Sequence, residues 1–490
     1  MAGHISHADR STGALREQVQ RLSPKGAPLP KPPKDSMTLR AHTPAHAHHP
    51  VGPKTATRFT PTTNLDEILP LRGLPRDELD AMKAVASVLP FRVNDYVVSE
   101  LIDWDRIPDD PIFQLTFPQR GMLAPQDFDR MLALIRADAQ PSEIRQAANE
   151  IRSGLNPHPG GQLELNVPSE DGVPLRGVQH KYDETVLFFP SSGQTCHAYC
   201  TYCFRWPQFV GNADLRFASR ECDSLVRYLR EHPEVTSVLI TGGDPMVMKT
   251  SVLRRYVEPL LDPSLTHLES IRIGTKSLSY WPQRYVSDED ADDLLRLIEE
   301  VRASNRHFAL MAHYSHPREL EPAIAQHAVQ RVLGAGATIR CQAPLIRQVN
   351  DDGDTWAEMW RAQVRAGAIP YYMFVERDTG PKQYFEVPLA RAFEIFQSAY
   401  RQVSGLARTV RGPSMSATPG KVVVDGVALL HGEEFFVLKF IQARDPSWVG
   451  RPFFARFDPK ATWLDDLRPP LGDKDFFFEP SMRALRARTN

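Results

Sequence analysis

The feature that most constrains the fold is an alternation of short apolar runs with helix-like stretches between about residues 185 and 405. The apolar runs have the length and β-branched content of buried strands, whereas the stretches between them carry apolar residues at helical spacing. The expected strands are Val186–Phe189, Val235–Ile240, Ser270–Ile273, His307–Met311, Thr338–Pro344 and Ile369–Val375. The expected helices are Ser219–Glu231, Ser251–Leu261, Asp288–Arg302, Arg318–Ala335, Trp356–Ala366 and Leu389–Val403. Six strands alternating with helices predict an α/β fold with a parallel sheet or partial barrel, in which ligands bind at the carboxyl ends of the strands.

The segments that flank this alternation differ from it in composition. Residues 1–62 are rich in Pro, His and basic side chains and have few large apolar ones, which predicts a disordered tail. We interpret its histidines as solvated rather than as a metal site; they are His42, His46, His48 and His49. Residues 63–180 show helical spacing, as in Leu79–Leu89 and Gln126–Ala137, and predict a helical N-terminal region.

The barrel is expected over residues 181–425. An aromatic, Pro-rich C-terminal extension is expected over 426–490, which either caps the barrel or forms an oligomer contact. The sequence leaves the oligomeric state open, with a homo-oligomer as one alternative.

The overall composition is that of a globular protein, with 42% hydrophobic and 24% charged residues among 490. The net charge of −2 gives no indication of a nucleic-acid partner. The sequence has no run of about 18 apolar residues, so we expect no membrane span. It has no apolar h-region at the N-terminus, so we do not expect secretion. Five cysteines, three of them clustered, argue against a disulfide scaffold and fit a reducing cytoplasm.

The clustered cysteines follow the first predicted strand with the spacing Cys-x3-Cys-x2-Cys, at Cys196, Cys200 and Cys203. Three thiolates on one tight loop can bind three irons of a [4Fe–4S] cluster and leave the fourth iron open to a ligand. Zinc sites usually have four ligands in two pairs, and the remaining Cys222 and Cys341 are isolated. The spacing therefore predicts a cluster whose open iron binds the amino and carboxylate groups of S-adenosylmethionine (SAM).

A second motif supports this prediction. The next predicted strand runs into Thr241-Gly-Gly-Asp-Pro245. Glycines at the end of a strand let the backbone approach a ligand closely, and an aspartate can receive the ammonium group of SAM. We predict that SAM is bound by Thr241, Gly242, Gly243 and Asp244.

Together with further stretches in the same order, these motifs resemble those of the lysine 2,3-aminomutase family of radical SAM enzymes. The resemblance covers about residues 80–425. Besides the two motifs above, it rests on Phe204-Arg205, Asn94–Asp110, Lys181-Tyr182, Arg272–Lys276, His313–Pro317, Gln342–Asp351, Pro370–Tyr372 and Pro419–Lys421.

The resemblance implies a partial (β/α)6 radical SAM barrel and a second cofactor, pyridoxal 5′-phosphate (PLP). It implies that Lys421 binds PLP covalently and that Lys181, Tyr182 and Gln342 help to hold it. A lysine amine must be partly neutral to attack an aldehyde, and desolvation can achieve this. Thr185 departs from the family pattern, because an arginine is usual at its position.

The implied reaction moves an amino group from C2 to C3 of an amino acid by means of a 5′-deoxyadenosyl radical, which is made by reductive cleavage of SAM. The implied partners are a small-molecule amino acid and an electron donor such as flavodoxin or ferredoxin. Arg205 matches the family's arginine for the substrate α-carboxylate, which a planar guanidinium can bind through two hydrogen bonds.

The predicted pocket for the substrate side chain departs from the family. Lysine-specific members hold the ε-ammonium with two aspartates, whereas here Arg377 aligns with one of them and Ser414–Thr418 contains no carboxylate. An arginine repels a buried ammonium and attracts a carboxylate. An alignment shifted by one residue would bring Glu376 or Asp378 into the pocket instead. The substrate therefore stays open between L-lysine and an acidic or neutral amino acid.

Two other interpretations also remain. One is a related radical SAM enzyme with another reaction, or one that acts on a lysine within a protein. The other is a non-catalytic iron–sulfur protein.

Overall fold

The computed structural model describes residues 58–59, 65–155, 165–210, 217–220, 222–470 and 472–489. The chain divides into two units, Met1–Gly52 and Pro53–Asn490, and every described residue belongs to the second. The predicted tail and its histidines lie outside the described residues, apart from strand β1 (Arg58–Phe59), which pairs with β2 (Val93–Asn94).

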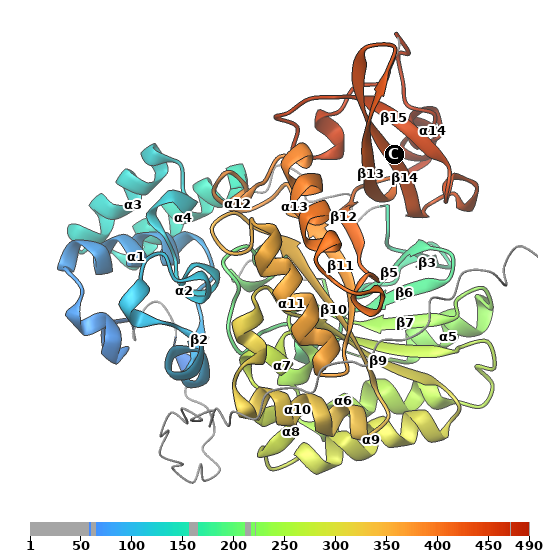
Figure 1. The fold of residues 1–490 in the computed structure, drawn as a ribbon. Helices are drawn as coiled ribbons and strands as arrows, with labels where there is room; N and C mark the ends of the chain where they lie inside the picture. The colour runs from blue at the N-terminus through green and yellow to red at the C-terminus, as the bar shows by residue number, and fades with distance from the viewer. Residues whose placement is uncertain are drawn as a thin grey trace, which may run out of the picture. The chain divides into compact units, whose positions relative to one another are not determined.

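An 11-stranded sheet forms the centre of the second unit (Figure 1). Its strands from β6 to β12 are parallel and adjacent in chain order. They are β6 (Thr185–Phe188), β7 (Ser237–Ile240), β8 (Ser270–Thr275), β9 (His307–His313), β10 (Thr338–Leu345), β11 (Ile369–Val375) and β12 (Arg411–Ser416). The predicted strands are confirmed as β6 to β11. The sequence pattern did not predict β12, because Gly412 and Pro413 interrupt it.

Helices connect the parallel strands and cover the outer face of the sheet (Figure 1). They are α5 (Asp223–Glu231), α6 (Thr250–Val257), α9 (Ala291–Ala303), α10 (Ala323–Gly334), α11 (Gly353–Arg365) and α13 (Leu389–Arg401), with the short helices α7 (Ser277–Tyr280), α8 (Gln283–Val286) and α12 (Lys382–Phe385). The strands alternate: in β7, Val238 and Ile240 are fully buried in the core between sheet and helices, and Leu239 points to the other face. No described helix is long and apolar enough to cross a membrane.

The N-terminal region is helical, as predicted. It contains α1 (Arg76–Val88), α2 (Pro111–Thr116), α3 (Pro125–Arg136) and α4 (Pro141–Leu155) around a core of its own. That core also includes Ala198, Tyr202 and Trp206 from the cysteine loop. The helical region therefore packs against the loop that carries the three cysteines.

The C-terminal extension continues the sheet beyond β12 with antiparallel strands. They are β13 (Gly420–Leu430), β14 (Glu433–Ala443) and β15 (Pro452–Arg456), followed by α14 (Glu479–Thr489). An antiparallel strand β5 (Val178–Tyr182) forms the opposite edge of the sheet. The extension has an aromatic core in which the Phe440 and Phe453 rings stack with centroids 5.5 Å apart, beside Trp448, Phe476 and Phe478.

One buried ion pair joins the N-terminal region to the barrel. The Asp110 carboxylate is fully buried and pairs with Arg318. It also accepts hydrogen bonds from the backbone N–H groups of Ile112 (2.9 Å) and Phe113 (2.8 Å), which begin α2. Removing one partner of a buried pair leaves the other charge without compensation.

We therefore expect Asp110→Ala to lower the free energy of unfolding by about 3–5 kcal/mol in denaturant titrations. The control is Asp66→Ala, which removes an exposed pair with Lys83 (2.8 Å) and should cost less than about 1 kcal/mol. Equal losses in the two variants would contradict this role of Asp110.

Candidate active site

A cavity of about 290 Å³ lies at the carboxyl ends of the parallel strands. Of the predicted site residues, those that line it are Cys196, Cys200, Cys203, Arg205, Thr241, Gly242, Gly243, Asp244, Gln342, Arg377 and Lys421. The fold thus brings together segments that are more than 200 residues apart in the chain. Lys181 and Tyr182 do not line the cavity.

The three cysteines share one wall of this cavity, and burial dominates their protonation. Burial, the Asp244 carboxylate and the neighbouring thiols raise the pKa of Cys196. Burial raises the pKa of Cys200 to about 11 and that of Cys203 to about 12. The thiols are therefore protonated at neutral pH, and binding iron would displace their protons.

The donor set fits a cluster better than a single ion. Among the described residues, no three His, Cys, Asp or Glu side chains converge on one point where a metal ion could bind. In a cubane cluster each cysteine binds a different iron, so its three sulfurs surround the cluster instead of meeting at one point. The assignment of Cys196, Cys200 and Cys203 as cluster ligands stays a prediction.

The cysteine loop is held in place by residues from the N-terminal region. Arg92 donates from Nη1 to Thr195 Oγ1 (2.6 Å) and to the carbonyl of Cys196 (3.3 Å). The backbone N–H of Thr201 donates to the carbonyl of Leu115 (2.9 Å). The sequence pattern did not point to Arg92, because a lone arginine some 100 residues before the cysteines carries no spacing signal.

The Gly-Gly-Asp motif lies directly against the cysteine loop. A Cβ on Gly243 would lie 2.4 Å from the carbonyl oxygen of Thr195, and Gly242 has a φ of +139°. Both positions therefore require glycine. This close approach fixes the distance between the motif and Cys196.

Asp244 ties two loops together at the edge of the cavity. Its buried carboxylate accepts hydrogen bonds from Thr275 Oγ1 (2.7 and 2.9 Å) and from the backbone N–H groups of Met246 (3.0 Å) and Lys276 (2.9 Å). Burial raises the pKa of Asp244, while these hydrogen bonds oppose the shift. The carboxylate thus joins the loop after β7 to the end of β8, and its predicted contact with SAM stays a prediction.

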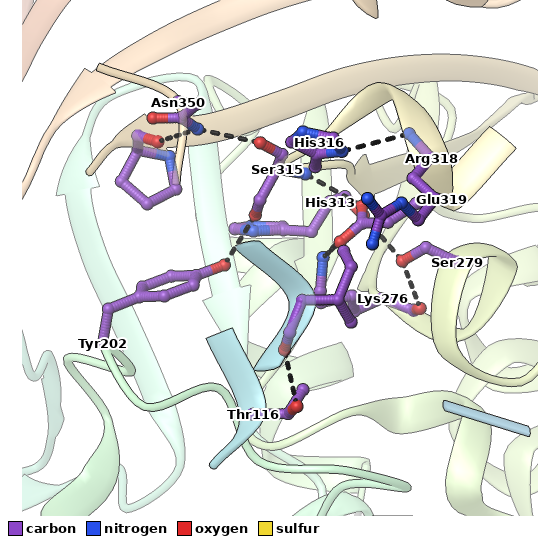
Figure 2. Close-up of polar contacts among 12 residues, drawn as sticks. Thr116, Tyr202, Lys276, Ser279, His313, Ser315, His316, Arg318, Glu319 and Asn350 are labelled. Carbon is purple, nitrogen blue, oxygen red and sulfur yellow. Dashed lines mark hydrogen bonds and ion pairs between the residues drawn. The ribbon is translucent and has the colours of Figure 1, made fainter. Parts of the chain in front are cut away.

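Figure 2 shows the polar network behind this edge. Lys276 pairs with the fully buried Glu319 (2.8 Å), whose pKa burial raises. Glu319 also accepts from the backbone N–H of Ser315 (2.9 Å), and the Ser315 hydroxyl lies 3.2 Å from the Tyr202 hydroxyl in the cysteine loop. Asn350 donates to the carbonyl of Ser315 (2.9 Å). The loops after β8, β9 and β10 are therefore linked to the cysteine loop.

Lys421 lies on β13, across the cavity from these loops. Its Nζ donates to Gln442 Oε1 (3.0 Å) and lies 4.2 Å from the centre of the Tyr372 ring. Burial, together with the cations of Arg272 and Arg411, lowers the pKa of Lys421 to about 8. A fraction of the amine is thus neutral at physiological pH, as attack on an aldehyde requires.

The loop that precedes Lys421 has each of its carbonyls bound by a donor. Lys181 Nζ donates to the carbonyl of Ala417. Arg444 donates from Nε to the carbonyl of Thr418 (2.9 Å) and from its backbone N–H to that of Pro419 (3.0 Å). Burial and the nearby cations of Arg444, Arg377 and Lys421 hold the pKa of Lys181 well below its usual range.

Two arginines line the cavity, and each has one buried guanidinium nitrogen without a hydrogen-bond partner among the described residues. Within the described part of the chain, Arg205 Nη1 and Arg377 Nε are buried and lack such a partner. Arg205 lies 4.6 Å from the centre of the Phe189 ring, and burial lowers its pKa to about 10. Arg377 Nε is 3.7 Å from the Asp378 carboxylate.

Glu376 lines the cavity beside Arg377, whereas Asp378 does not. Burial raises the pKa of Glu376 well above its usual range. Of the three side chains that the alternative alignments would bring to this pocket, Arg377 and Glu376 are thus present in the cavity and Asp378 is not.

Gln342 and Thr185 have specific partners. Gln342 Nε2 is 2.9 Å from Nε2 of His313, a cavity residue whose pKa burial and the cations of Lys276 and Arg205 lower to about 3. Arg272 donates from Nη2 to Thr185 Oγ1 (3.4 Å). An arginine from β8 therefore lies beside the position where the family usually carries one on β6.

Known proteins resemble the chain in sequence. No family model matches the chain. The chain is 29% identical over 397 residues to a "Putative L-lysine 2,3-aminomutase" of Aquifex aeolicus. This match covers 81% of this chain and 92% of that protein. The chain is also 24% identical over 343 residues to the L-lysine 2,3-aminomutase of Bacillus subtilis. That match covers 70% of this chain and 62% of that protein.

Solved structures resemble the chain only weakly. A radical SAM methyltransferase from Sphaerobacter thermophilus has a TM-score of 0.34 and 16% identity, and the match covers 48% of this chain and 68% of that one. A likeness at this level carries no argument about function.

The close approach of Gly243 to the cysteine loop can be tested. We expect Gly243→Ala to lower the iron content of the anaerobically reconstituted protein at least twofold, because the new Cβ would push the backbone of Thr195 and move Cys196. The control is Gly405→Ala, since nothing lies within 4 Å of a Cβ at that position. Equal iron contents in the two variants would contradict the prediction.

Proposed function

Because the chain belongs to the lysine 2,3-aminomutase family, we propose that it is a radical SAM, PLP-dependent aminomutase that moves an amino group from C2 to C3 of a free amino acid. The observation that carries this proposal is that the cysteine loop and Lys421 line the same cavity. One substrate can therefore contact both ends of the site.

The residues present fit the implied cofactors. Cys196, Cys200 and Cys203 would hold the cluster, and the segment 241–244 would bind SAM. The cluster and SAM, when bound, supply the radical that removes a hydrogen atom from an unactivated carbon. In the cell the cluster needs an electron donor, for which flavodoxin or ferredoxin is suited.

PLP would bind covalently to Lys421 and carries the migrating amino group when bound. Two observations support this role: the lowered pKa of Lys421 and the bound carbonyls of the loop before it. Lys181, Tyr182 and Gln342 are the residues that the family pattern assigns to PLP. Arg272 adds a guanidinium beside Thr185.

The chain's own side chains position the substrate and shield it. Arg205, with its unpartnered Nη1, binds the α-carboxylate. The neutral His313 and the apolar walls from Met311 and Phe374 keep charged groups and water away from the reacting carbons.

Charge favours an acidic amino acid, such as L-glutamate, as the substrate. Arg377 stays cationic, whereas burial favours the neutral form of Glu376. The side-chain end of the cavity therefore attracts a carboxylate. L-lysine is the second candidate, because Glu376 would receive its ammonium group if the carboxylate ionised.

The experiment is an anaerobic assay of the reconstituted protein with dithionite, SAM and PLP. L-glutamate, L-lysine and a panel of neutral amino acids are offered, and α- and β-isomers are separated by chromatography and mass spectrometry. We expect β-glutamate. β-Lysine alone would contradict the role of Arg377, and SAM cleavage without any β-isomer would contradict the aminomutase itself.

The roles of the two arginines can be separated by substitution. We expect Arg377→Met to lower kcat/KM for L-glutamate at least 30-fold, because a buried charge pair with the side-chain carboxylate is lost. For neutral amino acids, kcat/KM should change by only a few-fold. Arg205→Met should instead lower kcat/KM for every amino acid. If Arg377→Met lowers kcat/KM equally for all substrates, Arg377 does not face the substrate side chain.

A further inference from the structure

The C-terminal extension places a side chain directly against the reactive amine of Lys421. In the antiparallel pair of β13 and β14, Lys421 and Gln442 are opposite each other. Gln442 Oε1 accepts a hydrogen bond from Lys421 Nζ at 3.0 Å. Opposed residues in an antiparallel pair are close enough for such contacts, so the strand register itself sets this one.

This contact determines the direction of the lone pair when the amine is neutral. A neutral amine has two hydrogens and one lone pair in a roughly tetrahedral arrangement. One hydrogen is bound by Gln442, and the face of the Tyr372 ring, 4.2 Å from Nζ, lies near the other. The remaining direction is the one open to the cavity, which Lys421 lines.

The charges around Lys421 explain why the acceptor is an amide. The cations nearby are Arg272 from β8, Arg411 from β12 and Lys181 from β5, and the phenols of Tyr371 and Tyr372 come from β11. No described carboxylate forms an ion pair with Lys421. A carboxylate at position 442 would stabilise the ammonium form, whereas an amide accepts a hydrogen bond without adding charge.

The residue that follows β14 fixes the backbone that carries the amine. Arg444, two residues beyond Gln442, binds the carbonyls of Thr418 and Pro419, and its guanidinium donates to the carbonyl of Leu165 (3.1 Å). Strand β14 and the residue that follows it therefore hold both the end of the Lys421 side chain and the loop before it.

We propose that Gln442 is a site residue that directs the lone pair of Lys421 into the cavity and, because it is uncharged, lets the amine lose its proton. The proposal deepens the proposed function, and it rests on that function only for the identity of the aldehyde that reacts. The contact with Lys421 can be tested without PLP.

The test compares Gln442→Glu and Gln442→Met in the full-length protein. In the absence of PLP, competitive acetylation of Lys421 is followed by mass spectrometry as a function of pH. Only the neutral amine reacts, so the midpoint reports the pKa of Lys421. We expect Gln442→Glu to raise the midpoint by about one unit or more, because an opposite charge favours the ammonium form. Gln442→Met should leave the midpoint within about half a unit, because the burial and the surrounding cations remain.

A second readout is the rate at which added PLP develops its lysine-bound visible absorbance. We expect Gln442→Met to slow this rate about tenfold, a cost of about 1.4 kcal/mol in orientation. The matched control is Asp425→Asn, which removes an exposed pair with Lys439 (2.8 Å) on the same hairpin and should change neither readout.

An unchanged midpoint in Gln442→Glu, with thermal unfolding like that of the parent, would overturn the proposal. An unchanged PLP rate in Gln442→Met would overturn the orienting role. If the parent develops no PLP absorbance but Gln442→Glu still raises the midpoint, the proposed function fails and the effect of Gln442 on Lys421 stands.

Discussion

Buried positive charge around one cavity is the constraint on which the rest of this site depends. Arg205, Lys181 and Lys421 are half-buried, and none of them has an ion pair with a described residue. Removing a cation from water is costly unless an anion compensates it. Two acids at the cavity edge, Asp244 and Glu376, have raised pKa values because burial disfavours their charged forms. Carboxylate and phosphate groups of ligands are the anions that would complete such a site.

Residues from both ends of the chain hold the loops that surround this cavity. The parallel strands supply the edge where the loops meet, but the cysteine loop is held by Arg92 and Leu115 of the N-terminal region. The Lys421 loop is held by Arg444 of the C-terminal extension. The extension thus has a definite place in the site, which its aromatic composition alone did not indicate.

Much of the fold and of the site could be predicted from the sequence, because those parts depend on local patterns. Alternation of strands and helices predicted β6 to β11, and the predicted cysteine loop, Gly-Gly-Asp motif and lysine loop meet at one cavity. Strand β12 was missed because Gly412 and Pro413 hide its pattern. Arg92, Gln442 and Arg444 were missed because their contacts join distant segments and leave no spacing signal.

The pocket for the substrate side chain shows a different limit. The sequence left Arg377, Glu376 and Asp378 as alternatives, because an alignment shifted by one residue exchanges them. Within a strand only one of two consecutive side chains can face the cavity, because side chains alternate. Strand β11 ends at Val375, and in the loop beyond it both side chains line the cavity.

In the proposed function, the cysteine end and the Lys421 end of the cavity act on one substrate molecule. The most direct measurement uses L-glutamate and L-lysine that carry deuterium at C3, with mass spectrometry of the SAM recovered after turnover by the reconstituted protein. We expect deuterium from L-glutamate to appear in the adenosyl group of SAM. Consumption of SAM with no deuterium transfer from any amino acid offered would contradict it.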